Sequence, residues 1–116
     1  MLRLSLDFTY YVRKIRKIKE FINSSQIAIL YLTTKTCNVC KVLKPKVKDI
    51  ANQYDIVKDI YIELDDLPEL KREYSVFAVP TIILFVEGKE ALRYSRNIDL
   101  NDLHSKIERF NELMQQ

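Results

Sequence analysis

The sequence has few of the residues from which nucleotide and metal sites are built. Its 116 residues include one glycine, one histidine and two cysteines, and there is no tryptophan. A phosphate-binding loop needs several glycines, so this composition argues against a bound nucleotide. A zinc site normally takes four protein ligands, or three and a water molecule. One chain is short of such ligands, and we expect neither a resident metal nor a bound cofactor.

Long apolar runs and a strong net charge are absent as well. No run of 18 or more apolar residues occurs, which predicts that there is no transmembrane helix. The first residues do not place an apolar segment after a basic one, as a signal peptide does. The net charge of +3 is too small to indicate a dedicated nucleic-acid-binding protein. We therefore expect a cytoplasmic protein whose partners are neither membranes nor nucleic acids.

What the sequence does contain fits one globular domain, residues 1–116. Hydrophobic residues make up 47% of the chain and charged residues 30%, which is an ordinary balance for a folded protein. Early strands that alternate with helices indicate parallel pairing, and the last two strands form a hairpin around Glu87-Gly88. The spacing of apolar residues predicts strands at 2–6, 27–32, 60–64, 81–86 and 89–94, and helices at 8–22, 39–54, 67–74 and 100–114.

Cys37 and Cys40 carry the strongest chemical signal in the chain. Cys37 stands where an apolar strand has ended and a helix is about to begin. The attacking species in thiol–disulfide exchange is the thiolate, which needs a lowered pKa and access to solvent. Free N–H groups at a helix N-terminus stabilise a negative sulfur, and Lys35 and Lys41 add positive potential. Cys40, one helical turn later, would be shielded and placed to attack a mixed disulfide on Cys37.

Two other interpretations of the cysteine pair stay open. The cysteines could be incidental small apolar residues. They could also bind a metal, with His104 as the one further soft ligand in the chain, but zinc would then require two chains that share their pairs. A purely structural disulfide is disfavoured, because closing so short a loop removes little entropy from the unfolded chain.

Five motifs, taken together with their spacing, resemble the thioredoxin family over nearly the whole chain. They are Thr36-Cys-Asn-Val-Cys-Lys41, Pro45, Asp65, Val79-Pro80-Thr81 and Phe85-Val-Glu-Gly88. The resemblance implies an α/β thioredoxin fold, with a central mixed sheet of four to five strands and helices on both faces. It also implies a cis peptide bond before Pro80, opposite the cysteines, and pairing of the Val79 backbone with an extended substrate segment.

The chain departs from the family pattern around this site. Thr36 replaces the usual tryptophan before the first cysteine, and Asn38-Val39 replaces the usual Gly-Pro pair, which tunes the redox potential. Tyr31 occupies the place of a buried aspartate that assists proton transfer to the second cysteine. Arg96 replaces a glycine beside the substrate groove, where a cation could favour acidic partners. We therefore expect a specialised relative with a narrower partner set. Four residues are expected to contact the substrate: Thr36, Val79, Pro80 and Arg96.

The resulting hypothesis is a thiol–disulfide oxidoreductase that reduces protein or low-molecular-weight disulfides through a Cys37/Cys40 dithiol–disulfide cycle. Its partners would be disulfide-containing proteins or small-thiol substrates, and an NADPH-dependent flavoprotein reductase would regenerate the dithiol. The chain would act as a monomer, with no cofactor other than the redox-active disulfide. The alternative is a thioredoxin-fold module that binds partners beside Pro80, with weak or no redox turnover.

Overall fold

The computed structural model describes residues 2–115, and within this range strands and helices alternate before a final hairpin and helix. Along the chain the elements are α1 (Leu2–Ser24), β1 (Ile27–Thr33), α2 (Asn38–Asn52), β2 (Val57–Glu63), α3 (Leu70–Glu73), β3 (Thr81–Val86), β4 (Lys89–Ser95) and α4 (Leu100–Met114). None of the helices in the described residues is long and apolar enough to span a membrane.

The four strands form one mixed sheet in the order β2-β1-β3-β4. β1 runs parallel to β2 and antiparallel to β3, so that Ile27 is paired with Val57 on one side and with Val86 on the other. β3 and β4 form the antiparallel hairpin, with a register shift between Leu84 and Phe85. The predicted combination of parallel and antiparallel pairing is confirmed.

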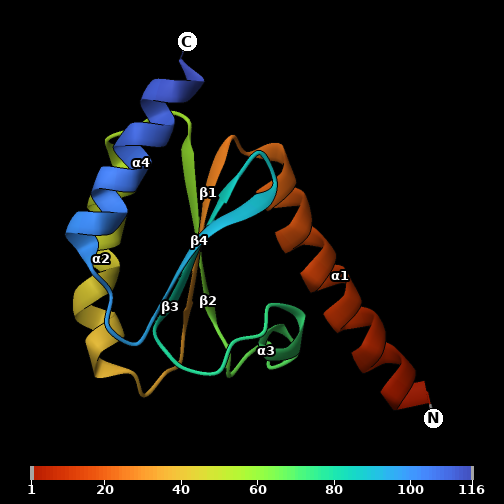
Figure 1. Cartoon of the computed structure of the whole chain (residues 1–116). Coiled ribbons are helices and arrows are strands. Elements are labelled where there is room, and N and C mark those ends of the chain that lie inside the picture. Colours follow the sequence, from red (N-terminus) through yellow and green to blue (C-terminus); the bar gives the residue numbers. More distant parts are fainter. Residues whose placement is uncertain (1, 116) are drawn as a thin grey trace.

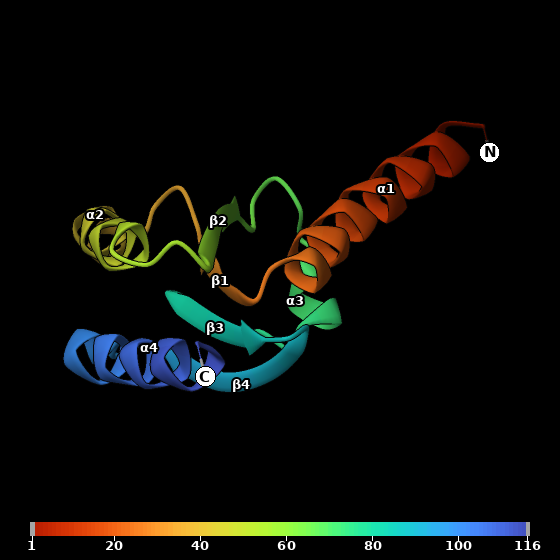
Figure 2. The ribbon, with the colours of Figure 1, turned by 90° about the horizontal axis from the view of Figure 1, so that it is seen from above.

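Helices cover both faces of the sheet. α2 and α4 lie on one face, and α1 and α3 lie on the other (Figure 1, Figure 2). Successive side chains of β1 point to opposite faces. Ile29 and Tyr31 belong to the apolar cluster with α2 and α4, whereas Leu30 and Leu32 belong to the cluster with α1 and α3. This two-sided burial explains why the β1 sequence is a continuous apolar run rather than an alternating one.

The predicted strand at residues 2–6 is wrong, because α1 begins at Leu2 and is continuous to Ser24. No glycine or proline separates residues 2–6 from the strongly periodic segment that follows. Leucine and arginine are good helix formers, and adding residues to an existing helix costs little compared with starting one. The sheet therefore has four strands in the described residues, and β2 is an edge strand. The N-terminal half of α1 extends away from the sheet (Figure 2).

Two further boundaries differ from the prediction. β2 begins at Val57, three residues before the predicted start, and the short helix covers only Leu70–Glu73. Aspartates at 65 and 66 could cap a helix that begins at residue 67, but α3 begins at Leu70 and Glu69 precedes it. A side-chain oxygen of Asp65 instead accepts a hydrogen bond of 2.7 Å from the backbone N–H of Lys35. This bond ties the loop before the cysteines to the end of β2.

The C-terminal half of the chain agrees closely with its prediction. β3 has the predicted bounds, and the hairpin turn places Glu87 at φ 52° and Gly88 at φ 81°. Glycine adopts such a conformation without the steric cost that a side chain imposes. The Asp99 side chain caps α4 by accepting the backbone N–H of Asp102 at 3.0 Å.

Candidate active site

Cys37 and Cys40 form a disulfide at the N-terminus of α2, with their Cα atoms 5.3 Å apart. Cys37 is the residue that caps this helix, and its backbone is extended. Its Sγ accepts the backbone N–H of Cys40 at 3.3 Å. The sulfur of Cys37 therefore lies against the positive end of the helix dipole, which stabilises negative charge placed there. This is the junction that the sequence predicts.

The two sulfur-bearing residues differ in their access to solvent. Cys37 is partly exposed, whereas Cys40 is buried, with 4% of its surface accessible. Asn38 and Val39, which stand between the cysteines, are both exposed. A substrate can therefore approach Cys37 from solvent while Cys40 lies behind it. This arrangement matches what a two-step exchange requires of its two thiols.

Tyr31 lies directly beneath the cysteine pair. It faces the cluster that contains Cys40, is fully buried, and donates its hydroxyl proton to the Cys40 carbonyl oxygen at 3.1 Å. Burial raises the pKa of Tyr31 to about 12. The phenol therefore stays neutral near pH 7 and does not take a proton from Cys40. The buried position that a carboxylate base would occupy in the family pattern thus holds a hydroxyl that fixes the first turn of α2.

A second tyrosine, Tyr61 of β2, packs against Tyr31 with the ring centroids 5.3 Å apart. Its hydroxyl donates to a carboxylate oxygen of Asp59 at 2.7 Å. Burial and this hydrogen bond to Asp59 both raise the pKa of Tyr61. Asp59 also forms an ion pair with Lys48 at 3.4 Å. The wall of the site on the β2 side therefore consists of two neutral phenols, with the charge of Asp59 already balanced.

The loop before β3 contains a cis peptide bond between Val79 and Pro80, as the family resemblance implies. Pro80 is buried and Val79 is half-buried. The carbonyl oxygen of Pro80 accepts the backbone N–H of Arg96 at 2.9 Å. Arg96 has φ 67°, in the left-handed region that favours glycine. The backbone beside Pro80 thus has the conformation for which the family uses glycine, while the exposed Arg96 side chain adds a cation.

Phe77 is a residue of this region that the sequence reasoning missed. It is 92% exposed, the most accessible large apolar side chain in the described residues. It lines a cavity of about 180 Å³ together with Thr34, Leu64, Lys71, Val76, Ala78 and Val79. The available signal was an aromatic residue in a predicted loop, two positions before Val79. Thr36 is also exposed, but it is not among the residues that line this cavity.

A second small cavity, of about 200 Å³, opens beside the disulfide. Both cysteines form part of its wall, and Thr34 borders both this cavity and the one beside Val79. The other residues around it are Tyr31, Thr33, Lys35, Lys41, Lys44, Tyr61 and Glu63. The Lys35 ammonium forms an ion pair with Asp66 at 3.2 Å, and this carboxylate raises the pKa of Lys35. The predicted contribution of Lys35 to the potential at Cys37 is therefore partly neutralised.

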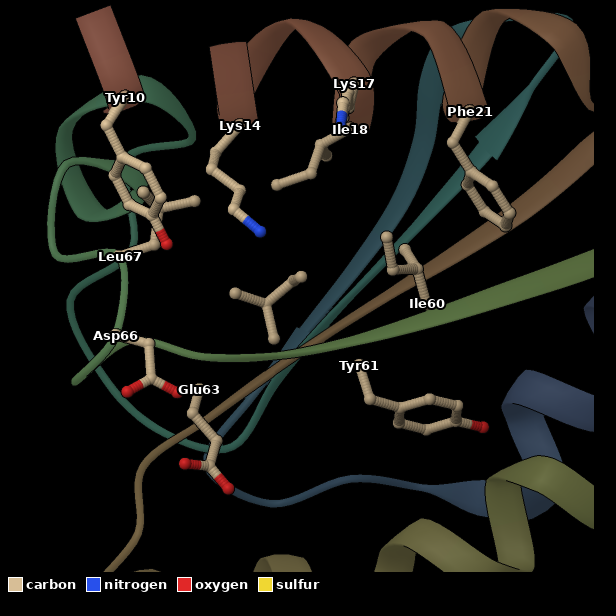
Figure 3. Close-up of a pocket in the computed structure, with 11 residues that line it drawn as sticks. Tyr10, Lys14, Lys17, Ile18, Phe21, Ile60, Tyr61, Glu63, Asp66 and Leu67 are labelled. Carbon is tan, nitrogen blue, oxygen red and sulfur yellow. The ribbon is translucent and has the colours of Figure 1, made fainter. Parts of the chain in front are cut away.

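A larger cavity, of about 590 Å³, lies away from the disulfide, between α1 and β2. Side chains of α1, including Tyr10 and Phe21, face those of β2, including Ile60, across this cavity (Figure 3). Neither cysteine lines it, whereas Tyr61 and Glu63 border both this cavity and the one beside the disulfide. The exchange chemistry therefore belongs to the smaller cavity.

The described residues contain no group of three or more histidine, cysteine, aspartate or glutamate side chains placed to hold a metal ion. His104, the one further soft ligand considered, lies in α4, and its Nε2 is 3.1 Å from the Tyr54 hydroxyl. The two rings meet edge to face with centroids 6.0 Å apart. In the structure His104 is thus a partner of Tyr54.

Comparison with known proteins identifies the architecture. The family model described as Thioredoxin matches residues 11–109. The thioredoxin-like protein YdfQ of Bacillus subtilis is 32% identical over 92 residues, which are 79% of this chain and 82% of that protein. A thioredoxin of Chlamydia trachomatis is 31% identical over 84 residues, covering 72% of this chain and 79% of its own length.

Solved structures agree with the sequence comparison. Thioredoxin 1 from Thermosipho africanus superposes with a TM-score of 0.71 and 30% identity, over 77% of this chain and 99% of that one. A mutant thioredoxin from Halobacterium salinarum superposes with a TM-score of 0.74 and 24% identity, over 81% and 82% of the two chains. The latter likeness concerns the fold alone.

Proposed function

The chain belongs to the thioredoxin family and is a thiol–disulfide oxidoreductase, and we propose that it acts as a protein-disulfide reductase in which Cys37 attacks and Cys40 resolves. The observation that carries this assignment is the unequal placement of the two sulfurs. Cys37 caps α2 and is open to solvent, whereas Cys40 is buried one turn later. Only the first of these positions is reachable by a substrate disulfide.

The proposed reaction transfers two electrons from the dithiol to the substrate. The Cys37 thiolate attacks one sulfur of the substrate disulfide, and that bond breaks as the mixed disulfide forms. The departing substrate thiolate takes up a proton. Cys40 then loses its proton and attacks the Cys37 sulfur, which closes the Cys37–Cys40 disulfide and releases the second substrate thiol. One substrate disulfide becomes two thiols, while one protein dithiol becomes a disulfide.

The proton on Cys40 leaves without help from a buried carboxylate. The Tyr31 hydroxyl borders the same cavity as Cys40, and it already donates to the Cys40 carbonyl oxygen. Its raised pKa of about 12 keeps it protonated. The acceptor is therefore water or the departing thiolate. In this proposal Tyr31 positions the peptide of Cys40 and takes no part in proton transfer.

The substrate segment is proposed to lie along the loop before β3. The half-buried Val79 would pair its backbone with the substrate, as the family resemblance implies, against the surface of Pro80. The exposed ring of Phe77 would cover an apolar residue next to the substrate disulfide. Thr36 lies on the loop before α2 and Arg96 on the loop before α4, and both side chains are exposed. They complete the proposed contact with the substrate segment.

The reduced state would be restored by an external two-electron donor. An NADPH-dependent flavoprotein reductase is the proposed donor, and small thiols are the alternative source. The chain would work as a monomer in the cytoplasm, where dithiols are kept reduced. We propose no group other than the redox-active disulfide as its cofactor. The competing function is a partner-binding module with slow cysteines. It is favoured by the neutral Tyr31 in the place of a base and by Thr36 in the place of the usual tryptophan.

Trapping with Cys40→Ser tests both candidate functions. The variant should hold disulfide substrates as stable mixed disulfides on Cys37, because the resolving thiol is missing. Cys37→Ser is the matched control and should trap none. Non-reducing electrophoresis with mass spectrometry measures the adducts, and the wild-type rate of insulin reduction measures turnover. Equal trapping by both variants would refute the assigned roles, and absence of turnover with an unreactive Cys37 would favour the binding module.

A further inference from the structure

The cavity beside the disulfide is bordered by cations whose charge is not balanced within the chain. Lys41 and Lys44 are exposed side chains in the first two turns of α2 and border the cavity together with both cysteines. In the described residues neither ammonium group forms an ion pair, whereas Lys35 is paired with Asp66 and Lys48 with Asp59. Lys44 lies 5.0 Å from the centroid of the Tyr61 ring. This contact orients the ammonium group without cancelling its charge.

Most acidic side chains around the cavity are already engaged elsewhere. Asp59 accepts the Tyr61 hydroxyl, and Asp65 accepts the backbone N–H of Lys35. The first turn of α2 contains no acidic residue. Glu63 is the one carboxylate among the residues that border the cavity. Two unpaired cations therefore face one carboxylate, and the positive end of the α2 dipole adds to the excess.

Position 31, next to the cysteines, also contributes no negative charge to the cavity. The buried Tyr31 borders the cavity and stays neutral, where the family pattern has a carboxylate. A small, partly enclosed space concentrates the potential of the charges on its walls. An anionic group that enters beside Cys37 therefore meets a positive field, and the buried Tyr31 places no negative charge against it.

We propose that this cavity selects disulfides that carry a carboxylate next to the reacting sulfur, with Lys41 and Lys44 as the cations that hold it. The inference rests on the proposed reductase activity and names the substrate class of the same site. Lys41 and Lys44 bind the carboxylate while Cys37 attacks the neighbouring sulfur. An acidic residue beside a protein disulfide and the carboxylate of a small disulfide present the same group to this cavity.

Three small disulfides of similar size distinguish charge from shape. Dithiodipropionate carries carboxylates, bis-hydroxyethyl disulfide is neutral, and cystamine carries ammonium groups. Rates of oxidation of the reduced protein are divided by the rates of dithiothreitol with the same disulfides, which removes their intrinsic reactivity. Because exposed ion pairs contribute about 0.2 to 1 kcal/mol each, two lysines should favour the anionic over the neutral disulfide by roughly 2- to 30-fold. Cystamine should react more slowly than the neutral compound.

Substitutions on α2 separate the cavity from the overall charge of the chain. Lys41→Gln with Lys44→Gln should remove most of the anionic preference, which is the ratio of the anionic rate to the neutral rate, and its dependence on salt. A change in the reactivity of Cys37 that follows from the lost positive charge alters both rates alike and cancels in this ratio. Lys46→Gln is the matched control, since Lys46 is an exposed lysine of the same helix that does not border the cavity. It should leave at least two thirds of the preference.

Two results on the preference would overturn the inference alone. The first is equal normalised rates for the anionic and neutral disulfides. The second is an equal loss of preference in Lys46→Gln and in the variant that combines Lys41→Gln with Lys44→Gln. In both cases the neutral disulfide is still reduced, and the proposed reductase activity stands. If none of the three disulfides is reduced while insulin still is, this inference fails alone. If insulin is not reduced either, the proposed function fails and this inference fails with it.

Discussion

The N-termini of α2 and α4 are built alike and serve different purposes. Both helices have 15 residues, and the residues that cap them, Cys37 and Asp99, have nearly the same backbone angles, φ −81° and ψ 99° against φ −87° and ψ 97°. In each, the capping side chain accepts the backbone N–H of the residue three positions later, at 3.3 Å in α2 and at 3.0 Å in α4. A carboxylate at α4 thus occupies the position of a sulfur at α2.

The resemblance extends to the next turn. A tyrosine hydroxyl from a neighbouring strand bonds the third residue of each helix, Tyr31 to the Cys40 carbonyl and Tyr94 to the Asp102 carboxylate at 2.6 Å. The difference is charge. α4 begins with two carboxylates, and α2 begins with none. The start of α4 carries a permanent negative charge, while at α2 this place is left for the thiolate that appears when the disulfide is reduced.

Of the substitutions at the two helix N-termini, Cys37→Ser should have the largest effect, because it abolishes turnover. Serine caps a helix at least as well as cysteine, so the reduced fold should survive, but turnover should fall by at least about 1,000-fold because the attacking sulfur is gone. Insulin reduction and thermal unfolding in reductant measure the two quantities. Asp99→Ala should keep turnover within about twofold. A Cys37→Ser variant that retains turnover would place the chemistry elsewhere.

The two tyrosines should differ in how they make stability depend on pH. Burial raises the pKa of Tyr31 from 10.0 to about 12 in the folded protein, so its contribution is complete below pH 10 and is lost as the pH rises through 12. At about 1.4 kcal/mol for each pKa unit, the loss is on the order of 3 kcal/mol. In Tyr31→Phe, the free energy of unfolding measured in urea should fall less on the alkaline limb, between about pH 10 and pH 12, by a similar amount.

Tyr94→Phe is the matched variant at α4. Burial and the bond to Asp102 raise the pKa of Tyr94, while that bond and the ion pair with Lys106 lower the pKa of Asp102. The Asp102 contribution is present above its ordinary pKa and is lost as the pH falls. Tyr94→Phe should therefore flatten both limbs, and Tyr31→Phe only the alkaline one. An acid effect of Tyr31→Phe would contradict this account.

Asp99→Ala tests how much the capping side chain of α4 contributes to stability. Loss of the capping carboxylate should lower the free energy of unfolding by about 1 kcal/mol, because the N–H of Asp102 loses its acceptor. Asp99→Ser keeps an acceptor and should recover most of the loss. Chemical denaturation at pH 7 measures both variants. If Asp99→Ala left the free energy of unfolding unchanged, the capping hydrogen bond would not stabilise α4.

The smallest expected effect lies in the loop that leads to α4. Arg96 is held at φ 67°, whereas no residue of the loop before α2 has a positive φ. Glycine relieves this strain but is more flexible when unfolded, so Arg96→Gly should stabilise the protein by about 0.5 to 1 kcal/mol. Arg96→Ala removes the side chain without relieving the backbone and should not stabilise. Equal stability of the two variants would refute the strain argument.

The elements that the sequence predicts well are those with strong local signals. β1 is a continuous apolar run, the hairpin has a glycine at its turn, and α4 has an aspartate immediately before its apolar stripe. The strand predicted at residues 2–6 is wrong because alternating leucines also fit a helix, and here they continue the periodic helix that follows them. No local sequence signal indicates that β2 is the edge strand of the sheet in the described residues.

Within the site, sequence spacing alone placed Cys37 and Cys40 at a strand–helix junction, because that relation depends on residues close together in the chain. The electrostatics of the site were decided by tertiary structure. Asp65 reaches the Lys35 backbone across 30 positions, and Asp59 is bonded by Tyr61 and paired with Lys48 from another element. Charges act through distance in space, so only the folded chain determines which lysines beside the disulfide keep an unbalanced charge.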